Sequence, residues 1–198
     1  MEAIRLEIQQ AVNLLFALDV ESMLLEVINT LKRDNQAIVK KQEDVSLLTQ
    51  RGYGTATEGE LALTPCEALY LLGEKKITIA DESSGEMINF PNLLVSFKAS
   101  DPTIWSKYLI YRDLRSRGYV VREGFGFGLD FRVYERGEYG EGTSKFIVFG
   151  VIEGSLVPID TLNDLLKYVQ SLKKDLILAV MDRRGEVVYY STSYFNLK

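Results

Sequence analysis

The stretch Leu129-Asp130-Phe131-Arg132-Val133-Tyr134 decides the fold class of the second half of this chain. Apolar side chains at 129, 131 and 133 alternate with Asp130, Arg132 and Tyr134, and this period of two is that of a β-strand with one buried face. Tyr134 shares the polar face of the strand. Residues 119–123 and 145–151 have the same strand character, so we expect three neighbouring strands.

Two helices and two further strands are predicted around these three strands. They cover residues 101–118 (helix), 161–172 (helix), 176–181 (a central strand) and 186–194 (a last strand, after a turn at 182–185). Asp101 is the expected N-cap of the first helix, with Pro102 at its first position, and Thr161 caps the second helix. The order α-β-β-β-α-β-β predicts a mixed α/β module with a largely antiparallel sheet.

The first half combines helices with short strands. Residues 2–33 are predicted to be helical, because apolar residues recur at helical spacing at Ile4, Ile8, Val12, Leu15 and Phe16 and again at Met23, Leu24, Val27, Ile28 and Leu31. Short strands are expected at 37–39 and 45–49, a hairpin at 77–80 and 87–90, and a short helix at 91–97. Thr64-Pro65-Cys66-Glu67 is a capping box that starts a helix, which Gly73 can end.

The two halves are expected to be separate domains of a mixed α/β (α+β) protein, with the boundary at Ser100-Asp101-Pro102. Residues 1–100 would form a helical extension and a small α/β domain, and residues 101–198 a second α/β domain. The first half carries 15 acidic and nine basic residues, a net charge of −6, whereas the second has a net charge of +1. This acidic total argues against a general nucleic-acid coat, so any RNA contact has to be local or shared with a more basic partner.

The composition excludes several kinds of site. The 198 residues include no His and a single Cys, Cys66, which excludes Ser-His-Asp and Cys-His catalysis and an internal disulfide. A zinc site would need mostly carboxylates, so we expect neither a metal nor another cofactor. No apolar run reaches the roughly 18 residues of a membrane span, and the acidic, amphipathic start differs from a signal peptide. We therefore expect a cytoplasmic protein with no membrane partner.

The stretch Gly124-Phe125-Gly126-Phe127-Gly128 has the glycine content of a phosphate-binding loop. It lies between two predicted strands, and no helix N-terminus would face a phosphate there. The pattern favours a tight or bulged hairpin connection.

Two surface features have both a structural and a functional interpretation. Four arginines near the end of the 101–118 helix form either a solvated face or an RNA contact: Arg112, Arg115, Arg117 and Arg122. The apolar and aromatic residues of the last strand either complete the core and the sheet edge or pair with another chain, which we favour slightly: Val187, Tyr189, Tyr190, Tyr194 and Phe195.

Several spaced motifs occur in a fixed order along the chain. They are Gly52-Tyr53-Gly54, the stretch 67–72, the stretch 108–119, Gly124-Phe125-x-Phe127-Gly128-x-Asp130-Phe131-x-Val133-Tyr134-x-Arg136-Gly137, Ser144-Lys145-Phe146 and the stretch 178–190. Together these motifs resemble the archaeal tRNA-splicing endonuclease family, and the resemblance covers roughly residues 45–195.

The resemblance implies metal-independent cleavage of bulge–helix–bulge precursor RNA by a Tyr, a His and a Lys. A ribose 2′-OH attacks the adjacent phosphate and leaves a 2′,3′-cyclic phosphate and a 5′-OH end. This chemistry needs a base, an acid and a cation that stabilises the transition state. The Tyr matches Tyr134 and the Lys matches Lys174, whereas Thr143 stands at the position of the His.

Thr143 departs from the family pattern in a way that matters chemically. A threonine hydroxyl does not titrate near neutrality, whereas an imidazole does so at about pH 6.5, and general acid catalysis contributes about 10²–10⁴-fold. The chain therefore resembles the structural subunit of a heterotetramer, in which a homologous catalytic subunit supplies the His and precursor tRNA is the substrate. Two alternatives remain: an active homomer with a substitute acid such as Glu141, and a scaffold of the same fold that no longer binds RNA.

A second departure from the family pattern concerns the contact between subunits. The turn at 182–186 resembles an acidic inter-subunit loop of the relatives, but it carries Arg183 and Arg184.

Overall fold

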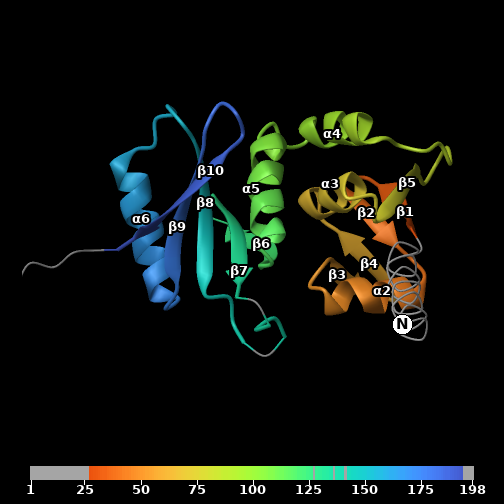
Figure 1. The fold of residues 1–198 in the computed structure, drawn as a ribbon, viewed down its shortest axis with the longest axis horizontal. Helices are drawn as coiled ribbons and strands as arrows, with labels where there is room; N and C mark the ends of the chain where they lie inside the picture. The colour runs from red at the N-terminus through yellow and green to blue at the C-terminus, as the bar shows by residue number, and fades with distance from the viewer. Residues whose placement is uncertain (1–26, 127, 136, 141, 194–198) are drawn as a thin grey trace, which may run out of the picture.

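The computed structural model describes residues 27–126, 128–135, 137–140 and 142–193. These residues form two mixed α/β domains, each with a five-stranded mixed sheet, and contain five helices between them (Figure 1). The expected fold class is confirmed. None of the described helices has the length and apolar character to cross a bilayer.

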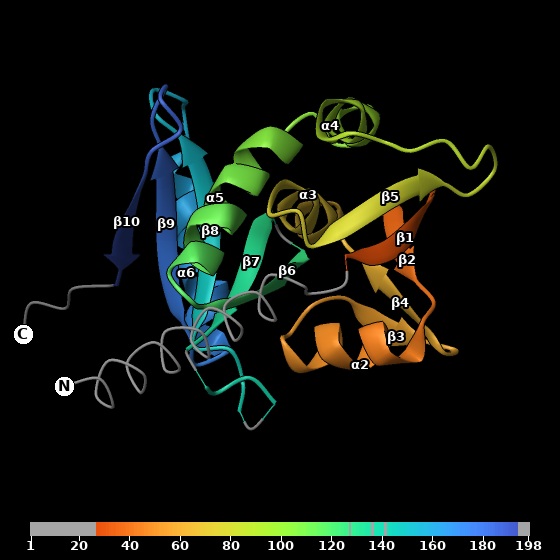
Figure 2. The same cartoon turned by 45° about the vertical axis from the view of Figure 1, so that its right-hand side comes forward.

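The N-terminal domain is built on a sheet with the strand order β3-β4-β2-β1-β5. Its elements are β1 (Ile28–Arg33), β2 (Gln36–Val39), α2 (Gln42–Gln50), β3 (Thr55–Thr57), β4 (Glu60–Leu63), α3 (Pro65–Gly73), β5 (Ile77–Asp81) and α4 (Phe90–Lys98). β1 and β5 are parallel, and the other strand pairs are antiparallel. Figure 2 shows β1 inside this sheet, with β5 beside it at the edge.

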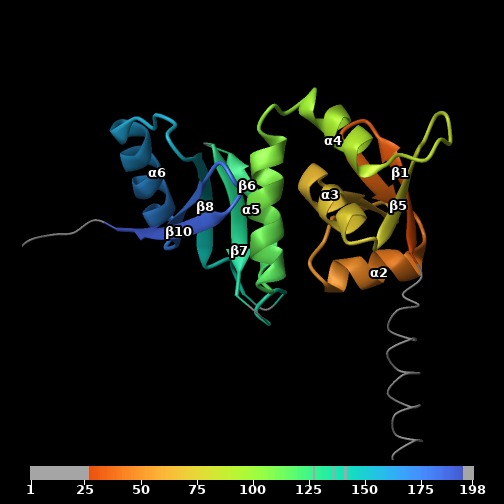
Figure 3. The ribbon, with the colours of Figure 1, turned by 45° about the horizontal axis from the view of Figure 1, so that its top comes forward.

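The C-terminal domain has the predicted order of elements. They are α5 (Ile104–Ser116), β6 (Val120–Gly126), β7 (Leu129–Tyr134), β8 (Phe146–Ile152), α6 (Ile159–Ser171), β9 (Asp175–Met181) and β10 (Val187–Thr192). The strand order is β10-β9-β8-β7-β6, and only the β8–β9 pair is parallel, so the sheet is largely antiparallel as predicted. α5 covers the face of this sheet that is turned toward the N-terminal domain, and α6 lies on the opposite face (Figures 1 and 3).

Three of the predicted elements in the first half are wrong, and two of them have a different secondary structure. Residues 28–33 form strand β1 and not the end of a helix, because β1 pairs with both β2 and β5 and buries Ile28 and Thr30 on one side. The rest of that predicted helix, residues 2–26, lies outside the described residues. Residues 45–49 belong to helix α2 and not to a strand, since Val45 and Leu48, three positions apart, are the two residues that α2 buries.

The third wrong element is the second hairpin strand, and the starts of two helices also differ from the prediction. Met87 makes only an isolated bridge to Ala80, and Asn89 caps α4 through its side chain, so no second hairpin strand forms. α5 begins at Ile104, because the Asp101 carboxylate accepts hydrogen bonds from the Thr103 N–H and hydroxyl in a preceding turn. α6 begins at Ile159 after Pro158, so Thr161 is inside the helix.

The capping box of α3 is confirmed and has a second role. Thr64 accepts a hydrogen bond from the Glu67 N–H, and the Glu67 carboxylate accepts one from the Thr64 N–H. Glu67 is almost completely buried, at 1% exposed. Its carboxylate also accepts from the Gly54 N–H and pairs with Arg122 of β6 at 3.2 Å. The helix cap is therefore part of the contact between the two domains.

A single apolar cluster runs through both domains. α3 packs on α5, and the Tyr70 and Tyr111 rings meet edge to face with their centroids 5.8 Å apart. A smaller cluster lies under α6 and contains Leu129, Ile147, Leu165, Val169 and Leu176. The predicted boundary at 100–102 falls in the link between α4 and α5, yet the core continues across it.

Candidate functional site

The sheet of the C-terminal domain brings together the strand ends beside which Tyr134, Thr143 and Lys174 lie. β7 ends at Tyr134, and its neighbour Val133 pairs with Phe146, the first residue of β8. Phe146 pairs in turn with Asp175, the first residue of β9. The end of β7 and the beginnings of β8 and β9 therefore lie at the same edge of the sheet, although residues 134 and 174 are 40 positions apart.

Backbone and side-chain hydrogen bonds hold this edge together. The Lys145 N–H donates to the Val133 carbonyl at 3.1 Å, and the Asp175 N–H donates to the Lys145 carbonyl at 3.1 Å. The Lys174 ammonium donates to the carbonyl of Ser144, a buried residue. Lys174 is thus held directly beside the residue that follows Thr143.

The three candidate residues differ in exposure. The Tyr134 side chain is half-buried and packs edge-on against Tyr139, with ring centroids 5.2 Å apart and an angle of 86° between the rings. Thr143 is exposed in the segment before β8. The substitute acid considered from the sequence, Glu141, lies outside the described residues.

Lys174 lies in a cationic environment. Partial burial, and then the nearby positive charge of Arg132, lower the pKa of its ammonium group below the usual value. Arg132 belongs to β7, where its guanidinium donates to the Glu123 carbonyl at 2.7 Å. Cations at this edge are suited to attract the phosphates of an RNA backbone.

The site combines a phenol, an aliphatic hydroxyl and an ammonium group, but no imidazole. It can position a phosphodiester and offset its charge. Proton transfer near neutrality needs a group that titrates there, and a threonine hydroxyl does not. Among the described residues there is also no cluster of three or more His, Cys, Asp or Glu side chains to hold a metal ion.

The structure separates the four candidate arginines. Arg122 lies between the domains with a side chain that is only 14% exposed, paired with Glu67 and bonded to the Gly52 carbonyl and the Thr55 hydroxyl. Burial raises the pKa of Glu67 even though the Arg122 guanidinium opposes this shift. Sequence reasoning missed this pair. The sequence did contain one indication of it: the capping-box residue Glu67 is close in sequence to a Gly-rich turn whose backbone N–H groups can donate to its carboxylate.

The other three arginines line the end of α5 and have different surroundings. Arg115 stacks on the Tyr53 ring, with its guanidinium carbon 3.7 Å from the ring centroid, and donates to the Arg51 and Tyr119 carbonyls. Arg117 pairs with Asp113 at 2.7 Å. Arg112 is exposed and lies over the Tyr108 ring at 5.7 Å. Of the four, Arg112 and Arg117 therefore face solvent.

The last strand has an inner and an outer face. β10 is the outermost strand of its sheet. Val187 and Tyr189 turn inward, and the Tyr189 hydroxyl donates to the Asp113 carboxylate at 2.7 Å. Tyr190 turns outward and is 53% exposed, as is Val188. Tyr194 and Phe195 lie outside the described residues.

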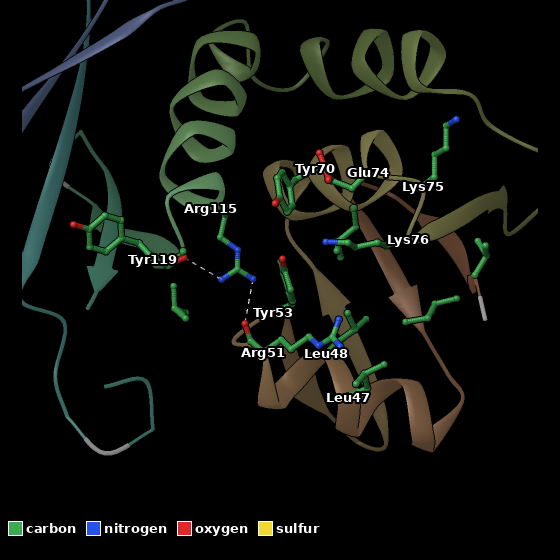
Figure 4. A pocket seen from close by; sticks show the side chains of 15 residues that line it. Leu47, Leu48, Arg51, Tyr53, Tyr70, Glu74, Lys75, Lys76, Arg115 and Tyr119 are labelled. Carbon is green, nitrogen blue, oxygen red and sulfur yellow. Dashed lines mark hydrogen bonds between the residues drawn. The ribbon is translucent and has the colours of Figure 1, made fainter. Parts of the chain in front are cut away.

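A cavity of about 600 Å³ between the domains was not expected from the sequence. Figure 4 shows Arg115 reaching from the end of α5 toward Tyr53, with Leu47 and Leu48 coming from α2 and Tyr70 from α3. Its residues come from five elements that are distant in sequence, so no local motif marks it.

Two family models match this chain. Residues 28–94 match the model described as tRNA intron endonuclease, N-terminal domain, and residues 104–189 match tRNA intron endonuclease, catalytic C-terminal domain.

Curated relatives match over similar lengths. A protein from Methanococcus vannielii named tRNA-splicing endonuclease is 34% identical over 164 residues, which are 83% of this chain and 92% of the relative. Relatives with the same name from Methanococcus maripaludis and Thermococcus kodakarensis are each 33% identical, over 164 and 148 residues. These matches cover 83% and 75% of this chain and 92% and 86% of the relatives.

Proposed function

This chain belongs to the tRNA intron endonuclease family, and on that premise we propose that it is the structural, RNA-positioning subunit of a tRNA-splicing endonuclease. A homologous subunit with a His at the position of Thr143 would carry out the cleavage of bulge–helix–bulge RNA. The two subunits would assemble as a heterotetramer that engages both bulges of one precursor tRNA.

The observation that carries this proposal is Thr143 in a chain without any His. Attack of the 2′-OH on the phosphate needs a proton donor for the departing 5′-oxygen. Because Thr143 does not titrate near neutrality, this site lacks that donor. Loss of general acid catalysis lowers the rate by about 10²–10⁴-fold, which leaves at most weak activity.

The retained parts of the site support a role in binding. Tyr134 and Lys174 still lie at one edge of the sheet, and Arg132 adds positive charge there. Such an edge can hold a phosphodiester without cutting it. β10 is an edge strand that a partner subunit could pair with, and its outward side chains Val188 and Tyr190 are each 53% exposed.

A cleavage assay with purified subunits tests the proposal. This chain alone should leave a bulge–helix–bulge RNA intact, and addition of a His-containing homologous subunit should yield 2′,3′-cyclic phosphate and 5′-OH ends. Cleavage by this chain alone at the rate of the mixture would contradict the proposal and favour the homomeric alternative.

A variant in the reconstituted complex shows whether the site of this chain takes part in cleavage. Tyr134→Phe in this chain should leave the cleavage rate within about twofold, because the reaction takes place in the partner. The control is the same change at the matching Tyr of the partner, which should lower the rate by about 10²-fold or more. A comparable loss from the change in this chain would show that its own site reacts.

A further inference from the structure

The cavity between the two domains has an apolar wall and a cationic rim. Val27, Leu47 and Val120 are among its apolar residues, and each of them is at least partly exposed. Its charged lining consists of four cations, Arg51, Lys75, Lys76 and Arg115, and one acid, Glu74. Within the described part of the chain, no carboxylate forms a salt bridge with any of these four cations.

These features define the chemistry of a suitable occupant. An RNA strand would satisfy the cations but would leave the apolar wall against a charged backbone. An acidic amphipathic peptide satisfies both, because its apolar stripe buries the wall while its carboxylates meet the rim. Figure 4 shows the Lys76 ammonium and the Arg115 guanidinium near the Tyr53 hydroxyl, whereas the Lys75 ammonium points away from them.

The chain itself contains a peptide of this kind. Residues 1–26 carry five acidic residues and one basic residue, a net side-chain charge of −4. Ile4, Ile8 and Val12 begin the apolar stripe that continues at Leu15 and Phe16. The N-terminal family match begins at residue 28, so this segment is additional to the shared domain.

The segment also joins the chain at the cavity. Val27 and Ile28 both belong to the lining, and the Ile28 N–H donates to the carbonyl of Lys76, one of the rim cations. A tethered segment has an effective concentration in the millimolar range next to its site, so even a weak contact is occupied.

We propose that residues 1–26 bind in this interdomain cavity of their own chain, with the apolar stripe against Leu47 and Val120 and the acidic residues toward Lys75, Lys76 and Arg115. Because the lining comes from both domains, the bound segment stabilises their relative placement.

Carbodiimide crosslinking of the full-length chain, read by mass spectrometry, tests this placement. Glu7 or Asp19 should become linked to Lys75 or Lys76, and the links should form within one chain when isotopically light and heavy protein are mixed. Glu21 and Glu26 are left out of the readout, because they lie too close in sequence to the cavity to be informative. Links of equal yield to Lys145 and Lys167 of the other domain, or links only between light and heavy chains, would overturn the proposal.

A matched pair of variants tests the apolar stripe. Val12→Asp should lower the yield of these links by about tenfold or more, because a carboxylate in place of a valine would have to be buried against the apolar wall. Gln10→Asp adds the same charge off the stripe and should leave the yield within about twofold. Equal yields in both variants would contradict a stripe-mediated contact.

A second pair tests the wall of the cavity. Leu47→Asp should reduce the links as Val12→Asp does, whereas Ser46→Asp, at the adjacent exposed position of α2, should not. Circular dichroism of each variant shows that the domains are folded. An unchanged yield in folded Leu47→Asp would place the segment elsewhere and overturn the proposal.

Discussion

At the scale of single residues, the chemistry of this chain depends on what stands at position 143. The sheet holds Tyr134 and Lys174 at one edge, and Thr143 precedes the Ser144 carbonyl that Lys174 binds. In the proposed role, the hydroxyl of Thr143 in place of an imidazole leaves a site that binds RNA but does not cleave it. Restoring the titrating group is therefore the most direct test of this interpretation.

The substitution Thr143→His should give this chain measurable cleavage of bulge–helix–bulge RNA on its own. A group that titrates at about pH 6.5 restores general acid catalysis, which contributes about 10²–10⁴-fold. The rate of RNA cleavage near pH 6.5 is the measurement. Thr143→Asn, which is polar but does not titrate, is the control and should remain inactive; equal activity of the two variants would refute the role of proton transfer.

At the scale of elements, the connection between β6 and β7 shows how backbone contact sets sequence requirements. The register of this pair shifts between Glu123 and Gly126, as in a β-bulge, which confirms the bulged hairpin predicted from the glycines. A Cβ at Gly124 would lie 2.1 Å from the Leu129 carbonyl oxygen. Glycine is needed at 124 because the opposite backbone occupies the space of a side chain.

Gly124→Ala should lower the free energy of unfolding by about 1–3 kcal/mol or more, because the added methyl group collides with backbone that has little freedom to move. Urea denaturation followed by circular dichroism measures the change. Gly142→Ala is the matched control: its Cβ would be 3.8 Å from the Glu138 carbonyl oxygen, an ordinary van der Waals distance, and its effect should be within about 0.5 kcal/mol. Similar losses in both variants would mean that the clash at 124 is relieved.

Strand β1 shows where local pattern fails. Residues 28–33 continue an apolar spacing that is typical of a helix, yet they form a strand that pairs on both sides within its sheet. The partners β2 and β5 supply backbone hydrogen bonds and burial that a single stretch of sequence does not reveal. By contrast, the capping box at Thr64 was predictable, because all its atoms lie within four residues.

At the scale of the whole molecule, the contact between the domains is both apolar and ionic. The main apolar cluster contains residues of both halves, and Arg122 of β6 reaches Glu67 of α3, Gly52 and Thr55. Glu67 is 1% exposed and Arg122 has a side chain that is 14% exposed. Since both partners are largely shielded from water, loss of either one leaves the other without its counter-charge.

Arg122→Met should lower the free energy of unfolding by about 3 kcal/mol at pH 7, the lower end of the range for breaking a buried pair. The loss should shrink as the pH falls. Burial raises the pKa of Glu67, and without Arg122 only the hydrogen bonds from Thr64 and Gly54 oppose this shift, so the folded variant takes up a proton more readily than the unfolded chain. When the pKa of a carboxyl is higher in the folded state than its ordinary value of 4.5, protonation of that carboxyl stabilises the folded state. This stabilisation is complete below pH 4.5 and is lost as the pH rises through the folded-state pKa.

Urea denaturation at pH 7 and at pH 5 measures both effects. Arg117→Met is the control, because its partner Asp113 and Arg117 itself are more exposed, at 29% and 52% of their side chains, and surface pairs contribute about 1 kcal/mol or less. Equal losses for Arg117→Met and Arg122→Met, or a loss at Arg122 that is independent of pH, would refute the interdomain pair as described.

The sequence alone determined the fold class, the order of elements in the C-terminal domain, the cap of α3 and the absence of an imidazole, because each of these follows from residue type or from neighbours a few positions apart. Only the tertiary structure decided that 28–33 is a strand, that Arg122 is bound to Glu67 and that a charged cavity lies between the domains beside their contact. Each of these features joins groups that are distant in sequence; Glu67 and Arg122, for example, are 55 positions apart. Pairing, desolvation and cavity shape arise when distant segments meet, so the local pattern does not contain them.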